Sequence, residues 1–348
     1  MAVHDDPDFS RLPAPLAELF ARAAERSFFS LPLWYHVLAR YGTESGSRIR
    51  LYVDGAARAA LVCRTATKPH RLLSLSNYYS TEHGPIYATG GPPLGQALGE
   101  IAREIADAQF DAVQLAGLDP SDESFARLID AFAASGLRPR RYFDSGTWYE
   151  PTAGMDFDRY VATRPGAMRN TWRRKNKALA AAHHVDYAFH DDDARLAEGV
   201  GDYERIYAES WKSAEPFPEF MPQLIRAAAT AGALRLGILK IDGIPAAAQC
   251  WLAWRGRATI YKLAHARRFN ALSVGTILTM RMMERVLERD RPREIDFGRG
   301  DDAYKKSFLS QRRERWGLLI ANPRTVAGRV LAWREAAAQV IRRLRRPR

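Results

Sequence analysis

The feature that most constrains the fold of this chain is a segment that occurs twice. Residues 51–63 read LYVDGAARAALVC, and residues 239–250 read LKIDGIPAAAQC. Each copy is a β-prone run, an Asp-Gly pair and an alanine-rich run that ends in cysteine. Asp-Gly between two such runs is a strong signal for a tight β-hairpin, because both residues tolerate the positive φ that the turn requires. The sequence therefore predicts one antiparallel hairpin in each half of the chain.

The segments that follow the two hairpins also correspond. The first hairpin precedes apolar residues at helical spacing over 98–105 and a β-prone run at 112–115, and the second precedes a helical pattern over 274–289 and a β-prone run at 294–297. Two copies of one α/β unit explain this order, and the alternative is that two common hairpins occur independently. We expect mixed, twisted sheets flanked by helices. The predicted divisions are an N-terminal half over 1–150, a C-terminal half over 155–322 and a basic amphipathic helix over 323–348.

The positive charge is concentrated in two places. The 52 Lys and Arg against 40 Asp and Glu give a net charge of +12. Two clusters without acidic residues supply ten of these charges, so the remaining chain is close to neutral and a uniformly basic, histone-like surface is excluded. The clusters are Arg169, Arg173, Arg174, Lys175 and Lys177, and Arg342, Arg343, Arg345, Arg346 and Arg348.

Each basic cluster has several interpretations. The first cluster lies on a predicted helix and has three interpretations. It is an electropositive surface for a phosphate-bearing ligand, a binding surface for tRNA, or a helix face that only contacts solvent. The second ends a helix in which Val330, Trp333 and Ala337 recur at helical spacing. Such a helix lies on anionic lipid or docks on the protein's own core. We expect no DNA partner.

Cysteine usage and hydropathy indicate the compartment. Cys63 and Cys250 are the only cysteines, which gives no disulfide framework and no zinc cluster. The first residues, MAVHDDPDF, lack the basic start and apolar run of a signal peptide, and no apolar run approaches the ~20 residues of a membrane span. The neighbouring pair His183-His184 and the run Asp191–Asp193 lack metal-ligand spacing, so we expect no metal. The expectation is a cytoplasmic protein, with peripheral contact at the inner face of the membrane as the alternative.

The segment YKLAHARRFNALSVGTIL, residues 261–278, is the most informative for chemistry. A predicted strand ends at His265, a polar loop follows, and a helix begins near Ser273. The unpaired N–H groups and positive dipole end of a helix start bind anions. Gly275 would let a ligand approach the backbone. The alternative is an ordinary helix N-cap.

This order of elements resembles the GCN5-related N-acetyltransferase superfamily. The stretch DFGRGDDAYKKSF at 296–308, with YKLAH and Ser-x-Gly upstream, is similar to the BioF2-like acetyltransferase domain. That group includes the CelD proteins of cellulose and exopolysaccharide loci and is related to the FemAB peptidyltransferases. The resemblance covers 155–322 well and the N-terminal copy more loosely.

The resemblance implies where a donor would bind. It implies acetyl-CoA or another acyl-CoA as donor, with a pyrophosphate loop of pattern Gln/Arg-x-x-Gly-x-Gly/Ala. Asn270, Ser273 and Gly275 occupy the matching positions, and only Gly275 fits the pattern. It also implies a strand that splays from its neighbour and exposes a backbone N–H near Leu263 or Ala264 for the thioester oxygen. The predicted donor-binding residues are Leu263, Arg268, Asn270, Ser273, Val274, Gly275 and Thr276.

Proton transfer and acceptor binding have their own candidates. We expect His265, Asp296 and Tyr304 to be catalytic, with Asp301 and Asp302 as further carboxylates. A hydrogen-bonded structural histidine and a carboxylate that caps its own loop are the alternatives for His265 and Asp296. Lys305 matches a lysine of the FemAB pattern. The predicted substrate-binding residues are Arg173, Asp301 and Lys305.

These features together predict an acyltransferase. It would move an acyl group from acyl-CoA to an amine or hydroxyl of a small molecule or of a cell-envelope or exopolysaccharide precursor, by direct attack on the thioester. One alternative is a non-catalytic accessory protein of a polysaccharide locus. Another is a FemAB-like ligase that uses aminoacyl-tRNA.

Overall fold

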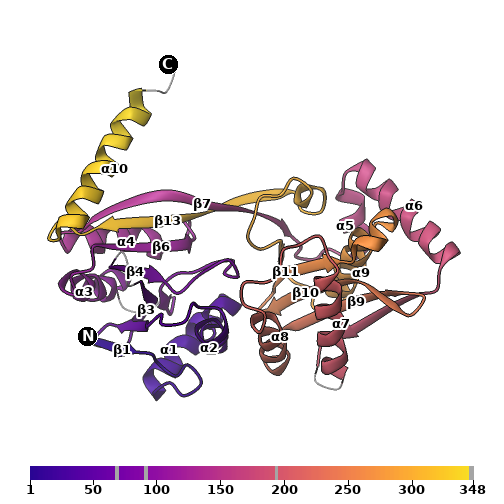
Figure 1. The fold of residues 1–348 in the computed structure, drawn as a ribbon, viewed down its shortest axis with the longest axis horizontal. Helices are drawn as coiled ribbons and strands as arrows, with labels where there is room; N and C mark the ends of the chain where they lie inside the picture. The colour runs from indigo at the N-terminus through magenta and orange to yellow at the C-terminus, as the bar shows by residue number, and fades with distance from the viewer. Residues whose placement is uncertain (67–69, 90–92, 193–194, 345–348) are drawn as a thin grey trace. The chain divides into compact units, whose positions relative to one another are not determined.

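The computed structural model describes residues 1–66, 70–89, 93–192 and 195–344, with only the backbone described at 336 and 338–344. The chain forms two compact units, which we call unit 1 (Met1–Ser145 and Glu314–Arg348) and unit 2 (Gly146–Arg313). Figure 1 shows the elements of each unit with their labels.

Unit 1 is a mixed sheet with helices packed on it. Its strands follow the order β1-β2-β3-β4-β6-β13-β7, and β5 pairs with β3. Helices α3 and α4 present an apolar stripe to this sheet, with Leu98, Ile101 and Phe132 in the core. The elements are β1 (Ala2–Asp5), α1 (Ala14–Ala24), η1 (Phe28–Ser30), α2 (Pro32–Tyr41), β2 (Ile49–Val53), β3 (Ala59–Ala66), β4 (Arg71–Ser74), β5 (Ile86–Tyr87), α3 (Leu94–Asp107), β6 (Ala112–Leu118), α4 (Glu123–Ala134), and α10 (Val326–Leu344).

Unit 2 has a second sheet, in the order β7-β12-β11-β10-β9-β8. The long helix α9 packs on it through Ile277, Met280 and Met283. Its elements are α5 (Phe157–Thr163), α6 (Gly166–Ala182), β8 (Val185–His190), α7 (Leu196–Ala208), α8 (Phe220–Thr230), β9 (Leu234–Ile241), β10 (Ile244–Trp254), β11 (Arg257–His265), η3 (Arg267–Leu272), α9 (Val274–Arg289), β12 (Glu294–Asp296) and η4 (Lys305–Ser307). Strands β7 (Arg138–Pro151) and β13 (Gln311–Ala321) carry the chain from one unit to the other.

The predicted fold class is confirmed. Both Asp-Gly hairpins form, as β2–β3 and β9–β10, and the predicted helix over 274–289 has those bounds. The residues before β8 form two helices, α5 and α6. They separate at Arg164 and Pro165, because proline restricts the residue before it to extended backbone and itself serves as the N-cap of α6. Strand β8 and helix α8 were not predicted.

The structure divides the chain differently from the predicted 1–150, 155–322 and 323–348. The final strand β13 pairs with β6 from Trp316↔Leu118 to Ala321↔Ala112, so residues from Glu314 onward belong to unit 1. The alternating pattern of β13 predicts a strand but carries no information on which sheet the strand joins.

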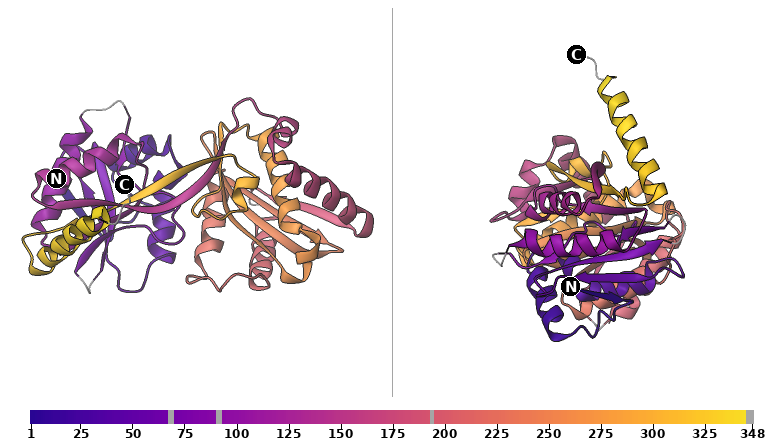
Figure 2. Two further views of the ribbon diagram at one scale, coloured as in Figure 1. Left: turned by 90° about the horizontal axis from the view of Figure 1, so that it is seen from above. Right: turned by 90° about the vertical axis from the view of Figure 1, so that its left-hand side faces the viewer.

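The predicted basic helix is α10, and it belongs to unit 1. Figure 2 shows it extending away from the sheet of that unit. Of the predicted arginine run, Arg345, Arg346 and Arg348 lie outside the described residues. Among the described residues, no helix combines the length and the hydropathy that a membrane span requires.

Candidate functional site

The candidate site of unit 2 begins where β11 continues past the end of the short strand β12. The ladder between these parallel strands covers only Arg257–Thr259, whereas β11 remains paired with β10 as far as His265. A register shift opposite Cys250 and Trp251 gives β11 an extra residue, which is a β-bulge. Bulges bend a strand and redirect its side chains. The C-terminal part of β11, including Leu263, therefore has one side without the β12 ladder.

The first turn of α9 follows directly. Ser273 adopts the left-handed conformation with φ 57°, and its side chain makes no capping hydrogen bond. The first backbone bond into the helix runs from the Ile277 N–H to the Ser273 carbonyl. The N–H groups of Val274, Gly275 and Thr276 thus form a helix start without a side-chain cap, which is a donor set suited to a phosphate. Val274 itself is buried in the core by its side chain.

His265 lies against this helix start. Its Nε2 is 2.9 Å from Oδ1 of Asn270, and its ring lies tilted against that of Trp211, with ring centroids 4.3 Å apart. The other nitrogen, Nδ1, is buried without a hydrogen-bond partner among the described residues. A Cβ on Gly275 would lie 3.1 Å from Nδ1, so any other residue here requires the His265 ring to shift by a few tenths of an ångström. Burial lowers the pKa of His265, the bond to Asn270 opposes this, and the charge of Lys212 adds to the lowering.

Lys212 is a functional candidate that the sequence did not reveal. It follows Trp211 in the bend that comes after α7. Burial lowers its pKa to about 8, and the positive charges of Lys262 and Lys305 add to the lowering while Glu215 and Asp302 oppose it. Lys262 lies on β11, and Asp302 lies in residues 297–304, which we call the glycine-rich turn. Lys212 is therefore near both β11 and this turn. An amine with a pKa near 8 is suited to accept a proton.

A second lysine of this region, Lys262, is held in an ion pair. Lys262 forms a buried ion pair with Glu215, Nζ to Oε1 3.1 Å. Nearby, Arg268 pairs with Glu209 at 3.2 Å, and the Arg267 N–H donates to the Glu209 carbonyl. These contacts join the segment before Lys212 to the loop η3.

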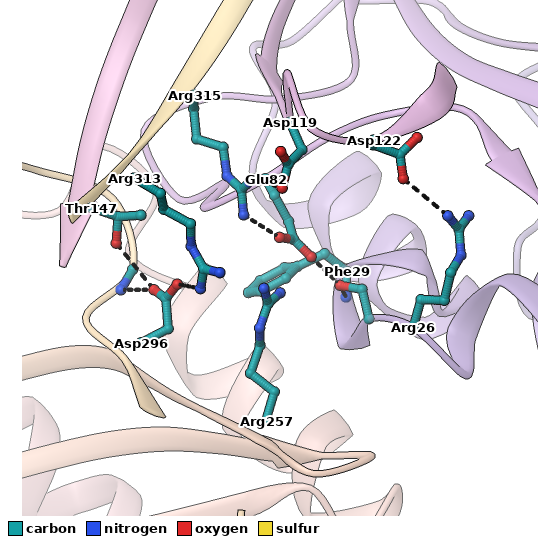
Figure 3. Close-up of polar contacts among 12 residues, drawn as sticks. Arg26, Phe29, Glu82, Asp119, Asp122, Thr147, Arg257, Asp296, Arg313 and Arg315 are labelled. Atoms are coloured by element: carbon teal, nitrogen blue, oxygen red, sulfur yellow. Dashed lines mark hydrogen bonds and ion pairs between the residues drawn. The ribbon is translucent and has the colours of Figure 1, made fainter. Parts of the chain in front are cut away.

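Asp296 ends β12 and is buried. Its Oδ1 accepts from the Thr147 hydroxyl at 3.1 Å and from the Gly298 N–H at 2.6 Å, and its Oδ2 pairs with Arg313 (Figure 3). Asp296 and Glu294 raise the pKa of Arg313 against the opposing effect of burial. Both oxygens of Asp296 are thus engaged: Oδ1 holds the Gly298 N–H and the Thr147 hydroxyl, and Oδ2 binds Arg313 of β13.

Lys305 is also engaged with the turn. Its Nζ lies 3.3 Å from the Phe297 carbonyl, 2.9 Å from that of Arg299 and 3.0 Å from that of Gly300. Burial lowers the pKa of Lys305, although Asp302 at 3.5 Å opposes this. An ammonium has three N–H donors, and three carbonyls surround this one.

The remaining predicted residues are exposed to different degrees. Tyr304 is 46% exposed and packs edge-to-face on Phe297, and burial of its hydroxyl raises its pKa. Asp301 pairs with Arg312 at 2.8 Å, which lowers the pKa of the carboxyl. Arg173 is exposed on α6.

Helix α6 contacts the loop before α9. The Lys175 ammonium donates to the Ala271 carbonyl at 2.8 Å, while Met168, Trp172 and Leu179 face the core. The exposed residues Arg173, Arg174 and Lys177 lie on the outward part of the same helix.

Unit 1 has a pocket of about 590 Å³ at the start of α3. Its lining is mixed in charge, with Arg22, Arg58 and Arg127 beside Glu18 and Glu123. It contains none of the predicted site residues. In the parts of the chain that the structure describes, no group of three or more His, Cys, Asp or Glu is placed to hold a metal ion.

Comparisons with known proteins bear on both units. Residues 166–306, within unit 2, match the family model described as Acetyltransferase (GNAT) domain. That segment contains α6, β11, α9 and the glycine-rich turn. No curated protein matches the chain.

Solved structures resemble the chain at low identity. The C-terminal domain (DUF2156) of a putative lysylphosphatidylglycerol synthetase from Agrobacterium fabrum is 12% identical, with a TM-score of 0.58 over 93% of this chain and 96% of that one. FemX is 13% identical, with a TM-score of 0.60 over 91% and 97%. A tandem GNAT protein from the clavulanic acid biosynthesis pathway is 15% identical, with a TM-score of 0.50 over 92% and 98%. The fold is therefore GNAT-like, and residues 166–306 carry a GNAT-type domain, which supports acyl transfer in the broad sense.

Proposed function

We propose that unit 2 transfers an acyl group from acyl-CoA, with acetyl-CoA as the simplest donor, to an amine or hydroxyl acceptor. The observation that carries the proposal is the start of α9 without a side-chain cap, after a strand that extends past the end of its parallel neighbour, inside the segment that matches the GNAT domain model. Helix starts of this kind bind phosphate groups, and CoA has several.

The donor fits the residues that surround this helix start. Gly275 keeps a Cβ out of a space that already holds the His265 ring, and the buried Nδ1 of His265 has no partner among the described residues. The N–H groups of Val274, Gly275 and Thr276 would hold the phosphates, and Arg268 would add positive charge. When bound there, an acyl-CoA supplies an activated carbonyl on its thioester.

The protein's own groups would act on the acceptor and the carbonyl oxygen. The backbone N–H near Leu263, on the part of β11 beyond the β12 ladder, would donate to that oxygen and stabilise the charge that develops on it. Lys212, with a pKa of about 8, would take the proton from the attacking amine or hydroxyl. His265 would orient this region through Asn270 and Trp211, and the exposed Tyr304 would return a proton to the leaving thiolate.

Asp296 and Lys305 would act through the turn between them. The carboxylate binds the Gly298 N–H and the ammonium binds the carbonyls of Arg299 and Gly300. We propose them as positioning residues, and Asp301 as a contact for a polar acceptor at the edge of the turn. The resemblance to the BioF2-like domain favours an envelope or exopolysaccharide precursor as that acceptor.

Calorimetric titration of the full chain with acetyl-CoA tests the donor. We expect saturable binding with a Kd below about 1 mM, and weaker binding of acetyl-phosphopantetheine, which lacks the nucleotide phosphates. No heat of binding at millimolar acetyl-CoA would overturn the acyl-CoA proposal and favour a non-catalytic accessory protein.

A second donor, aminoacyl-tRNA, has one observation in its favour. Helix α6 carries exposed Arg173, Arg174 and Lys177, and its Lys175 contacts the loop before α9. A polyanion on this helix would therefore lie beside the candidate donor site. The tRNA alternative requires salt-sensitive tRNA binding that is lost when the three exposed residues are changed to Ala.

A further inference from the structure

We propose that α10 is an interfacial anchor that lays an exposed apolar stripe on an anionic lipid surface. The stripe consists of Val326, Val330 and Trp333, which are 70%, 50% and 74% exposed. Their spacing of four and three residues places them on one face of the helix. Large apolar side chains this exposed at helical spacing are what an interfacial helix inserts into a lipid headgroup region.

The opposite face of the helix is already used for packing on unit 1. Gly328 is buried, and a Cβ there would overlap the carbonyl oxygens of Asn322 and Asp111. Further along, Ala332 and Glu335 line a shallow hollow with residues of β7 and β13. These positions lie about half a turn from the apolar stripe. The first turns of the helix therefore face unit 1 through Gly328, Ala332 and Glu335 and leave Val330 and Trp333 exposed.

The charged residues beside the stripe indicate what kind of surface binds it. Arg329 and Arg334 are exposed and flank it on either side, given 3.6 residues per turn. Over Val326–Leu344 the sequence has four arginines against one acidic residue, Glu335, a net charge of +3. Arginines extend their charged ends toward phosphates while their stems lie along apolar surface. Tryptophan favours the same headgroup level.

A second copy of the chain fits this face less well. It would bring an equally positive stripe against the first, and the like charges would repel each other. An anionic bilayer offers negative charge and apolar depth in one surface, so it satisfies both features of α10.

Sedimentation of the full chain with vesicles tests the anchor. We expect binding to phosphatidylcholine vesicles that contain about 30% phosphatidylglycerol, and at least tenfold weaker binding to pure phosphatidylcholine. The double variant Val330→Asp with Trp333→Asp should lose at least tenfold in partition coefficient. The double variant Ile244→Asp with Tyr78→Asp, which changes exposed apolar residues outside α10, should bind as the unchanged chain does.

Charge is tested separately. Arg329→Glu with Arg334→Glu should also weaken binding to the mixed vesicles at least tenfold, whereas Arg103→Glu with Arg226→Glu, exposed on other helices, should not. Equal binding to both vesicle types, or full binding by the Val330/Trp333 variant, overturns the proposal. A dimer that the same variant abolishes, without vesicle binding by the unchanged chain, assigns the stripe to a second copy and overturns it too. So does binding of tRNA through α10 in place of vesicles.

Discussion

The two units start a helix at the corresponding point of their folds, and the surroundings of that start differ. Helix α3 begins at Leu94 and α9 at Val274, and the second residue of each is a glycine, Gly95 and Gly275. A Cβ on Gly95 would make an ordinary contact, 3.7 Å from Cδ of Arg127, whereas one on Gly275 would press on His265 at 3.1 Å. A repeated fold thus repeats the backbone and not the chemistry. The start of α3 borders a pocket of mixed charge, whereas the start of α9 borders His265, whose buried Nδ1 has no hydrogen-bond partner among the described residues.

The buried basic groups show the same difference. In unit 1, burial lowers the pKa of His83 to about 4, so this imidazole is neutral throughout the physiological range. In unit 2, burial and neighbouring lysines lower the pKa of Lys212 to about 8, close enough to neutrality for the amine to exchange protons during turnover. This difference is the reason that we propose Lys212, and not His83, as a base.

Among the variants that test this difference between the two units, Lys212→Met should have the largest effect on turnover. A base works in its neutral form, so kcat/KM should rise with pH toward about 8 and level off above it. The variant should lose about 10²–10³-fold in turnover and the rising limb of the profile, because general-base catalysis contributes on this order. The measurement is release of the CoA thiol with a panel of amine and hydroxyl acceptors.

Two matched variants separate chemistry from fold. Lys306→Met removes an exposed lysine of the same region, and His83→Gln removes the buried base of unit 1. Both should keep the rising limb. If Lys212→Met retains turnover and profile, the contrast between the units does not rest on this amine.

The next largest effect, on donor affinity, is expected at the glycines in the second position of α3 and α9. Gly275→Val should raise the Kd for acetyl-CoA about 30-fold, roughly 2 kcal/mol, since a side chain there displaces His265 and crowds the helix N–H groups. Gly95→Val, at the same helical position in unit 1, should leave the Kd unchanged. Calorimetry measures both, and equal losses would place the donor somewhere other than the start of α9.

Local signals explain which parts of the fold could be predicted. Both hairpins and α9 follow from Asp-Gly turns and apolar periodicity, which depend on neighbouring residues only. The membership of β13 in unit 1 could not be predicted, because strand pairing is a long-range property. Helix α8 was missed because its apolar residues follow a proline-rich segment that resembles a loop.

The candidate site shows the same limit. The loop of His265, Ser273 and Gly275 is contiguous in sequence and could be predicted as one anion site. Lys212 lies far from that loop in sequence, and its pKa depends on Lys262 and Lys305, which only the tertiary structure brings near it. Asp296 was predicted as a catalytic carboxylate, and its partners Thr147 and Arg313, from β7 and β13, could not be read from its neighbours.

The smallest effects distinguish positioning from catalysis within unit 2. Asp296→Asn weakens a buried pair with Arg313 and should lower the free energy of unfolding by about 2 kcal/mol, because hydrogen bonds to charged groups contribute on that order. Tyr304→Phe, at a half-exposed side chain, should change it by less than about 0.5 kcal/mol and still lower turnover about tenfold. Denaturant unfolding and thiol release measure the two quantities on the same samples. If the Asp296→Asn variant stays stable but loses turnover, Asp296 is a catalytic residue and not a positioning residue. If the Tyr304→Phe variant keeps full turnover, Tyr304 is not a catalytic residue.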